Sequence, residues 1–221
     1  MSTRPKLLDL CCKAGGTSMG YHRAGFDVTG VDIEPQPRFP FRFIQADALE
    51  YVAEHGHEYD VIAASPPCQR YTRASFTAEN RQRHPDLIGT TRSLLQRIGV
   101  PYVIENVNGA PMQRPAIELC GLMFSLKVFR HRYFESSIAL MSKPHPSHRG
   151  KRIGIDGYCC VIGHGGGPNY RTRLRGAADN KVAWQRAMGI DWMTRDEMSQ
   201  AIPPAYTEFI GRQLIDILEN R

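Results

Sequence analysis

Short apolar runs alternate with helical or glycine-rich segments along the first half of the chain. Five of these runs predict strands, at Lys6–Cys12, Asp27–Asp32, Phe41–Gln45, Tyr59–Ala64 and Pro101–Ile104. Helices are predicted between them: one that the glycine-rich turn after the first strand opens and that continues to about Ala24, and two more at Ala48–Glu54 and Asp86–Arg97. Strands that alternate with helices in this way indicate an α/β fold with a mostly parallel sheet.

The second half of the chain is less regular. We predict a short helix at Ala116–Leu122 and a strand at Val128–Phe134 that presents Arg130 and Arg132 on one face. Helices are then predicted at Val182–Met188, Thr194–Gln200 and Pro203–Glu219. Residues 141–180 are basic and rich in Gly and Pro, with little helical signal and too few apolar residues for a core of their own. We therefore expect one domain built from 1–140 and 181–221, with a small insertion at 141–180.

The first strand runs into the turn Lys13-Ala14-Gly15-Gly16, and the second strand ends in Asp32. A strand, a glycine turn, a helix and a second strand that ends in an acid form the layout of a nucleotide-binding unit. In such a unit the glycines let the backbone approach the ligand and the acid holds the ribose hydroxyls. The alternative is a tight turn beside an exposed aspartate.

The stretch Ser65-Pro66-Pro67-Cys68-Gln69 follows the fourth predicted strand. Two prolines end a strand, so the thiol of Cys68 is expected on a stiff turn just beyond the sheet. Glu105 follows the next strand, and parallel order places both residues at the same edge, where ligands bind in such sheets. The alternative is a buried structural cysteine.

Composition narrows the class of protein. The 221 residues carry a net charge of +6, which suits a polyanionic partner, and no window has the roughly 18 uninterrupted apolar residues of a membrane helix. None of the six cysteines forms a C-x-x-C pair. We therefore expect neither a zinc site nor a disulfide, and we expect the protein to be located in a reducing cytoplasm.

Four motifs in this order resemble those of the DNA cytosine-5 methyltransferases. Asp9-Leu10-Cys11-Cys12-Lys13-Ala14-Gly15-Gly16 resembles the first motif of that family, Pro66-Pro67-Cys68-Gln69 its nucleophile motif, Glu105-Asn106-Val107 its glutamate motif and Arg130-His131-Arg132 its paired-arginine motif. Ala205-Tyr206-Thr207 loosely resembles the final motif. The resemblance covers residues 6–136 well and 182–219 loosely.

The resemblance implies a Rossmann-like fold that binds S-adenosylmethionine and methylates carbon 5 of a flipped-out cytosine through a covalent cysteine adduct. The implied catalytic residues are Cys68, Glu105, Arg130 and Arg132. The implied cofactor-binding residues are Asp9, Cys11, Cys12, Ala14, Gly15, Gly16, Asp32, Ile33, Asp47 and Pro66. No metal ligand is implied. Double-stranded DNA is the implied partner of a monomeric enzyme, with a restriction nuclease or phage modification enzymes as possible associates.

Three departures from the family pattern affect these expectations. Cys11 stands where the family usually has a phenylalanine on the adenine, so Ile33 is the expected replacement, and the asparagine-serine pair of the final motif is absent near Gly211-Arg212. The short 141–180 insertion, with Arg171, Arg173 and Arg175, predicts a short target of about two to four base pairs. The alternatives are an RNA (tRNA) cytosine-5 methyltransferase and an inactive relative that only binds nucleic acid.

Overall fold

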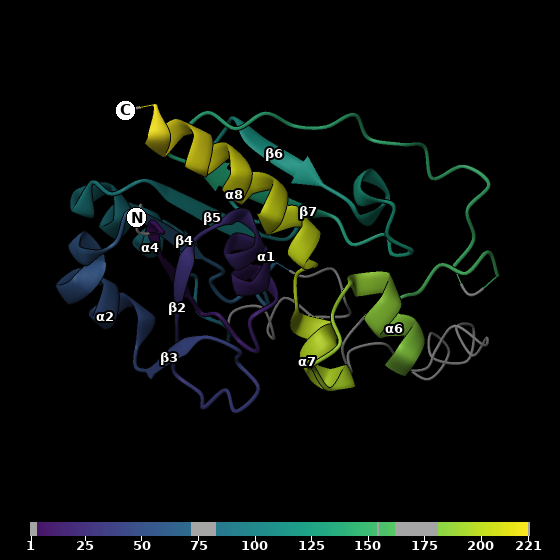
Figure 1. The fold of residues 1–221 in the computed structure, drawn as a ribbon, viewed down its shortest axis with the longest axis horizontal. Helices are drawn as coiled ribbons and strands as arrows, with labels where there is room; N and C mark the ends of the chain where they lie inside the picture. The colour runs from purple at the N-terminus through teal and green to yellow at the C-terminus, as the bar shows by residue number, and fades with distance from the viewer. Residues whose placement is uncertain (1–3, 72–82, 154, 162–180, 221) are drawn as a thin grey trace.

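A seven-stranded sheet forms the centre of the protein, in the order β3-β2-β1-β4-β5-β7-β6. The computed structural model describes residues 4–71, 83–153, 155–161 and 181–220 (Figure 1). The strands are β1 (Lys6–Leu10), β2 (Asp27–Asp32), β3 (Arg42–Gln45), β4 (Val61–Ala64), β5 (Tyr102–Asn106), β6 (Ala116–Leu119) and β7 (Arg132–Ser136). The first five are parallel, and β7 lies antiparallel between β5 and β6. The expected α/β, mostly parallel architecture is confirmed.

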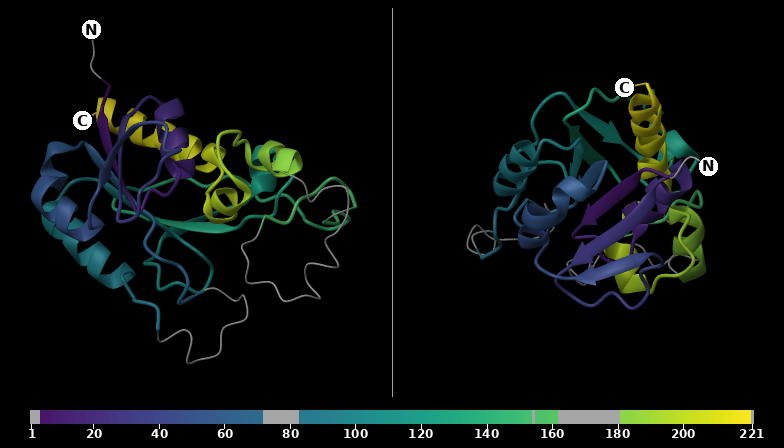
Figure 2. Two further views of the ribbon diagram at one scale, coloured as in Figure 1. Left: turned by 90° about the horizontal axis from the view of Figure 1, so that it is seen from below. Right: turned by 60° about the vertical axis from the view of Figure 1, so that its left-hand side comes forward.

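Helices cover both faces of the sheet. On one face, α1 (Gly16–Ala24) packs along α8 (Pro204–Glu219), and the other face carries α2 (Ala48–His55) and α4 (Ile88–Ile98) (Figure 1). The remaining helical segments are the 3-10 turns η1 (Gly56–Glu58) and η2 (Gly121–Phe124) and the helices α6 (Lys181–Met188) and α7 (Arg195–Gln200). Figure 2 shows α6 and α7 beyond the sheet, at the end of the molecule where α8 begins.

Each face of the sheet has its own hydrophobic core. Leu7, Val28 and Val61 belong to the core under α1 and α8. Leu8, Val31 and Ile62 belong to the core under α2 and α4. Because successive side chains of a strand point to opposite faces, a strand covered on both sides is expected to be mostly apolar. The central strands follow this pattern, with Asp9 of β1 and Thr29 of β2 as buried polar exceptions.

A third hydrophobic cluster connects the described part of residues 141–180, where an insertion is predicted, to the rest of the protein. Cys159 and Val161 pack against Trp184 and Met188 of α6 and reach Ala14 of the glycine turn. The described part of the insertion therefore uses its few apolar residues to dock on α6 rather than to build a core of its own, as its composition suggests. Residues 162–180, with Arg171, Arg173 and Arg175, lie outside the described residues.

Two sequence predictions for the second half are wrong. Residues 116–122 do not form a helix, because Ala116–Leu119 pairs with β7 as the edge strand β6. The 3-10 turn η2 follows at Gly121–Phe124. Their backbone hydrogen bonds go to a strand distant in sequence, which local periodicity does not reveal. The predicted strand at 128–134 begins later than expected, at Arg132, so Arg130 precedes β7.

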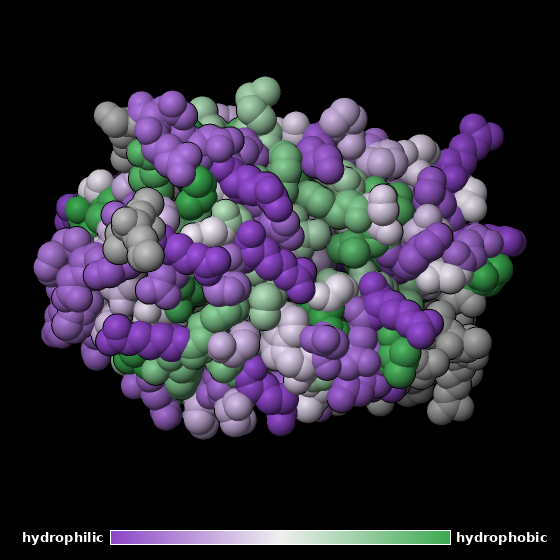
Figure 3. Space-filling view, viewed as in Figure 1, coloured by the Kyte–Doolittle hydropathy of each residue, from purple (hydrophilic) through white to green (hydrophobic). Residues whose placement is uncertain are grey.

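The solvent-exposed surface is mostly polar. Hydrophilic side chains cover much of the face shown in Figure 3, and hydrophobic ones form small groups between them. Large apolar side chains that are exposed include Ile33 and Met141. Among the described residues, no helix is long and apolar enough to span a bilayer.

Close contact between α1 and α8 depends on small residues. A Cβ at Gly20 would collide with the Thr207 hydroxyl and with the carbonyl oxygen of Pro204. The same threonine donates its hydroxyl to the carbonyl of Thr17 at 2.8 Å, so the two helix backbones are hydrogen-bonded through one side chain. Gly20 is thus required by the approach of α8.

We expect Gly20→Ala to destabilise the protein by about 1–3 kcal/mol, because overpacking forces two helices apart. Gly89→Ala is the matched control, since Gly89 lies in α4 and a Cβ there meets nothing within 4 Å. That control should raise stability by roughly 0.5–1 kcal/mol, as glycine is a poor helix former. Urea unfolding of both variants measures the difference, and equal effects would contradict the packing argument.

Candidate active site

The carboxyl ends of β1, β4 and β5 lie side by side at one edge of the sheet. Leu10 pairs with Ala64, and Ala64 pairs with Ile104. The residues that follow are therefore neighbours, and the Ser65 N–H donates to the Leu10 carbonyl at 3.0 Å. The glycine turn, the Cys68 turn and Glu105 all extend from this edge, as the parallel order predicts.

The turn that carries Cys68 is held by β5. The Nδ2 of Asn106 donates to the Pro66 carbonyl at 2.9 Å, and the Tyr71 N–H donates to the Cys68 carbonyl at 3.0 Å. Asn106 is buried, and its Oδ1 accepts from the Val107 N–H at 3.0 Å. Asn106 is part of the motif Glu105-Asn106-Val107 in the sequence, where no role was assigned to it. Its amide, next to the glutamate of that motif, was the sequence signal for a positioning role.

Glu105 is buried beside Arg132. The Nε of Arg132 lies 3.1 Å from Oε1 of Glu105. This contact lacks hydrogen-bond geometry, and within the described ranges Oε1 has no hydrogen-bond partner. Burial raises the pKa of Glu105, and the charges of Arg132 and Arg130 partly offset that rise. The site therefore contains a buried carboxyl oxygen that lies beside an arginine and makes no hydrogen bond with the described residues.

Arg130 is tied to backbone carbonyls rather than to the Cys68 turn. Its guanidinium donates to the carbonyls of Val161 and Ser199, each at 2.8 Å. Its own carbonyl accepts from the Tyr206 hydroxyl at 2.6 Å. Burial, followed by the charge of Arg132, lowers the pKa of Arg130 to about 9, and Glu105 and Cys68 act in the opposite direction. Arg130 is still charged at neutral pH, close to the carboxyl and the thiol.

Asp32 closes the glycine turn at the end of β2. Its buried carboxylate accepts from the Lys13 N–H at 3.0 Å and from the Glu34 N–H at 3.1 Å. The ammonium of Lys13 lies 3.6 Å from Asp32 and 2.7 Å from Glu34. Ile33, the next residue, is 66% exposed although it is large and apolar. A buried acid thus stands beside an uncovered apolar side chain.

Asp9 accepts hydrogen bonds from side chains in the first turn of α1. Its carboxylate accepts from the hydroxyls of Thr17 at 2.6 Å and Ser18 at 2.5 Å, and its other oxygen has no hydrogen-bond partner among the residues described. Burial raises its pKa to about 6. Asp9 is therefore enclosed by protein beneath the helix that follows the glycine turn.

The glycines of the turn are packed by the chain itself. Gly15 adopts φ +83°, and a Cβ there would lie 3.0 Å from the ring of Phe39. A Cβ on Gly16 would lie 2.5 Å from the carbonyl oxygen of Ile202. The sequence interpretation, in which both glycines leave room for a ligand, is therefore incomplete, because protein atoms occupy the space at Gly16.

The remaining expected cofactor residues surround this turn. Cys11 has a positive φ of 57°, and burial together with the charge of Asp32 raises its pKa to about 12. Cys12 is buried against Gly30, and the Ala14 carbonyl accepts from the indole of Trp192 at 2.8 Å. Asp47 caps α2, since its Oδ1 accepts from the N–H groups of Leu49 and Glu50.

Comparison with solved structures establishes the fold. The protein has a Rossmann-like α/β fold that it shares with several solved methyltransferases. It aligns with the S. pombe Dnmt2 methyltransferase at a TM-score of 0.62 and 13% identity, covering 97% of this chain and 99% of that one. It aligns with the Entamoeba histolytica methyltransferase EhMeth at a TM-score of 0.62 and 12% identity, covering 98% of this chain and 99% of that one. A third alignment is with a prophage-encoded protein from E. coli that is named as a DNA modification methyltransferase. Its TM-score is 0.61 and its identity 16%, and it covers 97% of this chain and 99% of that one.

Sequence comparison finds a more limited similarity. The Type II methyltransferase M.XorII of Xanthomonas oryzae pv. oryzae is 29% identical over 123 residues. The match covers 48% of this chain and 29% of that enzyme, so the chain spans less than a third of the length of this curated relative. No protein-family model matches the chain.

The buried Asp9 carboxyl makes stability dependent on pH. Its ordinary pKa is 3.8 and its folded pKa is about 6. Below the lower value both states are protonated; as pH rises through the interval, the unfolded chain ionises first and stability is lost. Relative to Asp9→Asn, wild type should lose on the order of 3 kcal/mol between about pH 4 and pH 7. Urea unfolding across that range tests this, and a difference independent of pH would contradict it.

Proposed function

We propose that this protein is a DNA cytosine-5 methyltransferase that uses Cys68 as a covalent nucleophile. The observation that supports this most strongly is the pairing of two features at one sheet edge. One is the turn that presents Cys68, and the other is the buried Glu105 with an oxygen left without a hydrogen bond. A thiol beside a carboxyl of raised pKa is the pair that activation of a pyrimidine ring requires.

The chemistry follows from the weak nucleophilicity of cytosine carbon 5. The Cys68 thiolate adds to carbon 6, and a proton reaches N3, so that carbon 5 becomes the nucleophilic end of an enamine. Carbon 5 would then take the methyl group that bound S-adenosylmethionine supplies, with S-adenosylhomocysteine as the leaving group. Loss of the carbon 5 proton to a base and return of the N3 proton to Glu105 would then expel the Cys68 thiolate and restore the aromatic ring. Because its raised pKa favours the protonated form, Glu105 can donate that proton to N3 while it accepts from the exocyclic amine.

The arginines supply positive charge to this edge. Arg132 lies within ion-pair distance of Glu105 and can meet the cytosine O2. Arg130 is held by two carbonyl groups and contributes a positive charge close to Cys68. Its backbone anchors leave it as an electrostatic group and a positioning residue in this proposal.

S-adenosylmethionine is the cofactor that goes with this fold, and when bound it supplies the sulfonium methyl group. The residues at the end of β2 fit such a molecule. Asp32 offers carboxylate acceptors for ribose hydroxyls, and Ile33 offers an uncovered apolar surface for the adenine. In this arrangement Ile33 takes the place of the phenylalanine that Cys11 replaces.

Double-stranded DNA is the proposed substrate, which means that the target cytosine is flipped out of the stack. The net charge of +6 favours a nucleic acid, and two proteins similar to this one are named as acting in DNA modification or as a Type II methyltransferase. Methyl transfer from radiolabelled S-adenosylmethionine to duplex DNA and to tRNA, measured in parallel, tests the choice. Transfer to tRNA alone would move the assignment to RNA, and transfer to neither would indicate an inactive relative.

Cys68→Ala should abolish methyl transfer and leave S-adenosylmethionine binding largely intact, because the thiol is assigned to the base. With duplex DNA that contains 5-fluorocytosine, wild type should form an adduct that survives a denaturing gel, since fluorine blocks the final elimination. Cys160→Ala is the matched control, another half-buried cysteine, and should keep the adduct. An active wild type that shows no shifted band would refute the covalent mechanism.

Asp32→Asn should weaken S-adenosylmethionine binding by roughly 10–100-fold, because each charge-assisted hydrogen bond contributes about 1.5–3 kcal/mol. Glu34→Gln is the control, as it removes an exposed charge from the same ion-pair group around Lys13. Titration calorimetry with S-adenosylmethionine measures both variants. An unchanged affinity for Asp32→Asn, or an equal loss in the control, would place the ribose elsewhere.

A further inference from the structure

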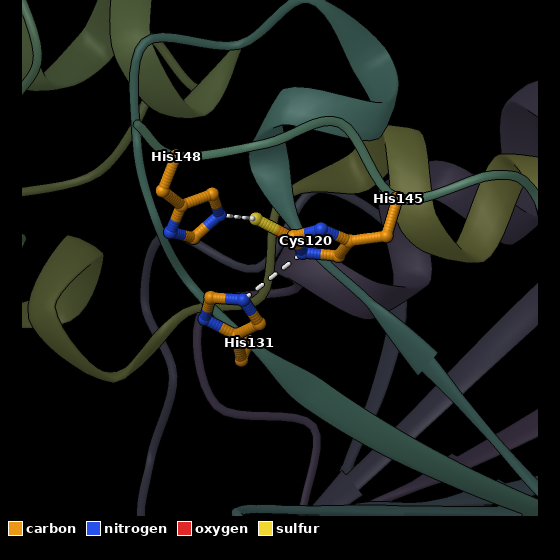
Figure 4. Close-up of side chains that lie close together, drawn as sticks. All are labelled: Cys120, His131, His145 and His148. Carbon is orange, nitrogen blue, oxygen red and sulfur yellow. Dashed lines mark hydrogen bonds between the residues drawn. The ribbon is translucent and has the colours of Figure 1, made fainter. Parts of the chain in front are cut away.

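Cys120, His131, His145 and His148 bring their side chains together outside the candidate active site. One ligand atom from each residue lies within 4.8 Å of those of the others. They come from three places in the fold: the end of β6, the residue before β7, and the extended segment after β7. In Figure 4 the sulfur and the three imidazole rings point toward a common centre.

We propose that these four residues form a structural site for a divalent transition metal, and that zinc is the metal it takes. One thiolate and three imidazoles complete a tetrahedral set and leave no position open for substrate. The mixture of a soft sulfur with nitrogen ligands suits Zn²⁺ and does not suit Mg²⁺ or Ca²⁺, which prefer oxygen. This site is separate from the proposed methyl-transfer chemistry.

Two of the distances between ligand atoms are close to those of a tetrahedral zinc site. Zinc–sulfur and zinc–nitrogen bonds of about 2.3 Å and 2.0–2.1 Å place neighbouring ligands of a tetrahedron roughly 3.3–3.6 Å apart. The Cys120 sulfur lies 3.4 Å from Nε2 of His148, and Nε2 of His131 lies 3.1 Å from Nε2 of His145. At least one nitrogen of the histidine pair must lack its proton, which is the state that a metal ligand requires.

The surroundings also favour a cation. Cys120 is fully buried, and backbone N–H groups of Leu122 and Gly121 hydrogen-bond to its sulfur, as they would to a metal-bound thiolate. The Oε1 of Glu118 lies 3.8 Å from Nε2 of His131. The ring of His148 stacks on Phe129 with centroids 4.5 Å apart, which limits its rotation.

A metal at this place would have a structural consequence. His145 and His148 lie in a segment without helix or strand, and the metal would bind that segment to the edge of the sheet. It would also hold His131, the residue between Arg130 and Arg132, at the start of β7. The metal would thus stabilise both the base of the insertion and the strand that carries the paired arginines.

We expected no metal site from the sequence because none of the cysteines forms a C-x-x-C pair. The ligands here are one cysteine and three histidines spread over three segments. The sequence signal is His145-Pro146-Ser147-His148, a close histidine pair that its basic neighbours obscure.

Metal analysis of the untagged protein, purified from zinc-supplemented medium and dialysed, tests the proposal. We expect one zinc per chain by mass spectrometry. After replacement with Co²⁺ alone, the spectrum should contain the intense visible bands of tetrahedral cobalt and a thiolate-to-cobalt charge-transfer band. A wild type without stoichiometric metal and without these bands would overturn the proposal.

Variants distinguish this site from nonspecific metal binding. His145→Ala removes an exposed side chain, so it should fold while its zinc affinity falls more than tenfold, and Cys120→Ser should lose the charge-transfer band. His57 is another exposed histidine, so His57→Ala is the control and should keep the zinc affinity and the charge-transfer band. A chelator should lower the thermal midpoint of wild type and of His57→Ala only. Equal metal content in all three variants would refute the site.

Discussion

The alignment of three parallel strand ends is the constraint on which the rest of this protein depends. Because β1, β4 and β5 are in register and end together, the glycine turn, the Cys68 turn and Glu105 emerge side by side. One hydrogen bond, from Asn106 to the Pro66 carbonyl, then connects two of these ends. A shift of one residue in the β4–β5 pairing would turn Glu105 to the other face of the sheet and separate the carboxyl from the thiol.

Burial of polar groups at this edge destabilises the fold, and the core must offset it. Asp9 and Glu105 both have raised pKa values because they lie out of water, and each keeps an oxygen without a hydrogen bond among the described residues. For Asp9 that oxygen is enclosed beneath α1, whereas for Glu105 it lies at the sheet edge. Unsatisfied acceptors of this kind are uncommon in folded proteins and are more frequent where a ligand completes them.

Local patterns predicted what local forces determine. The strand at Asp27–Asp32 has the predicted bounds, because Gly25 ends the preceding helix and Val28 and Val31 then enter the hydrophobic cores on opposite faces of the sheet. The placement of Cys68 and Glu105 at one edge followed from topology rules. Residues 116–119 were mistaken for a helix, since only pairing with β7 makes them a strand. The cluster around Cys120 was missed for the same reason, because long-range packing alone assembles it.

The two carbonyls bound by Arg130 connect two distant stretches of the chain to the segment that precedes β7. Val161 and Ser199 lie far apart along the chain, yet one buried guanidinium holds both. The stretch between them contains α6 and most of α7, whose Trp184, Met188 and Met198 share a hydrophobic cluster with Ala14 of the glycine turn. A displacement of α6 or α7 would therefore be felt at both the glycine turn and the paired arginines, so that these helices couple two parts of the strand-end region.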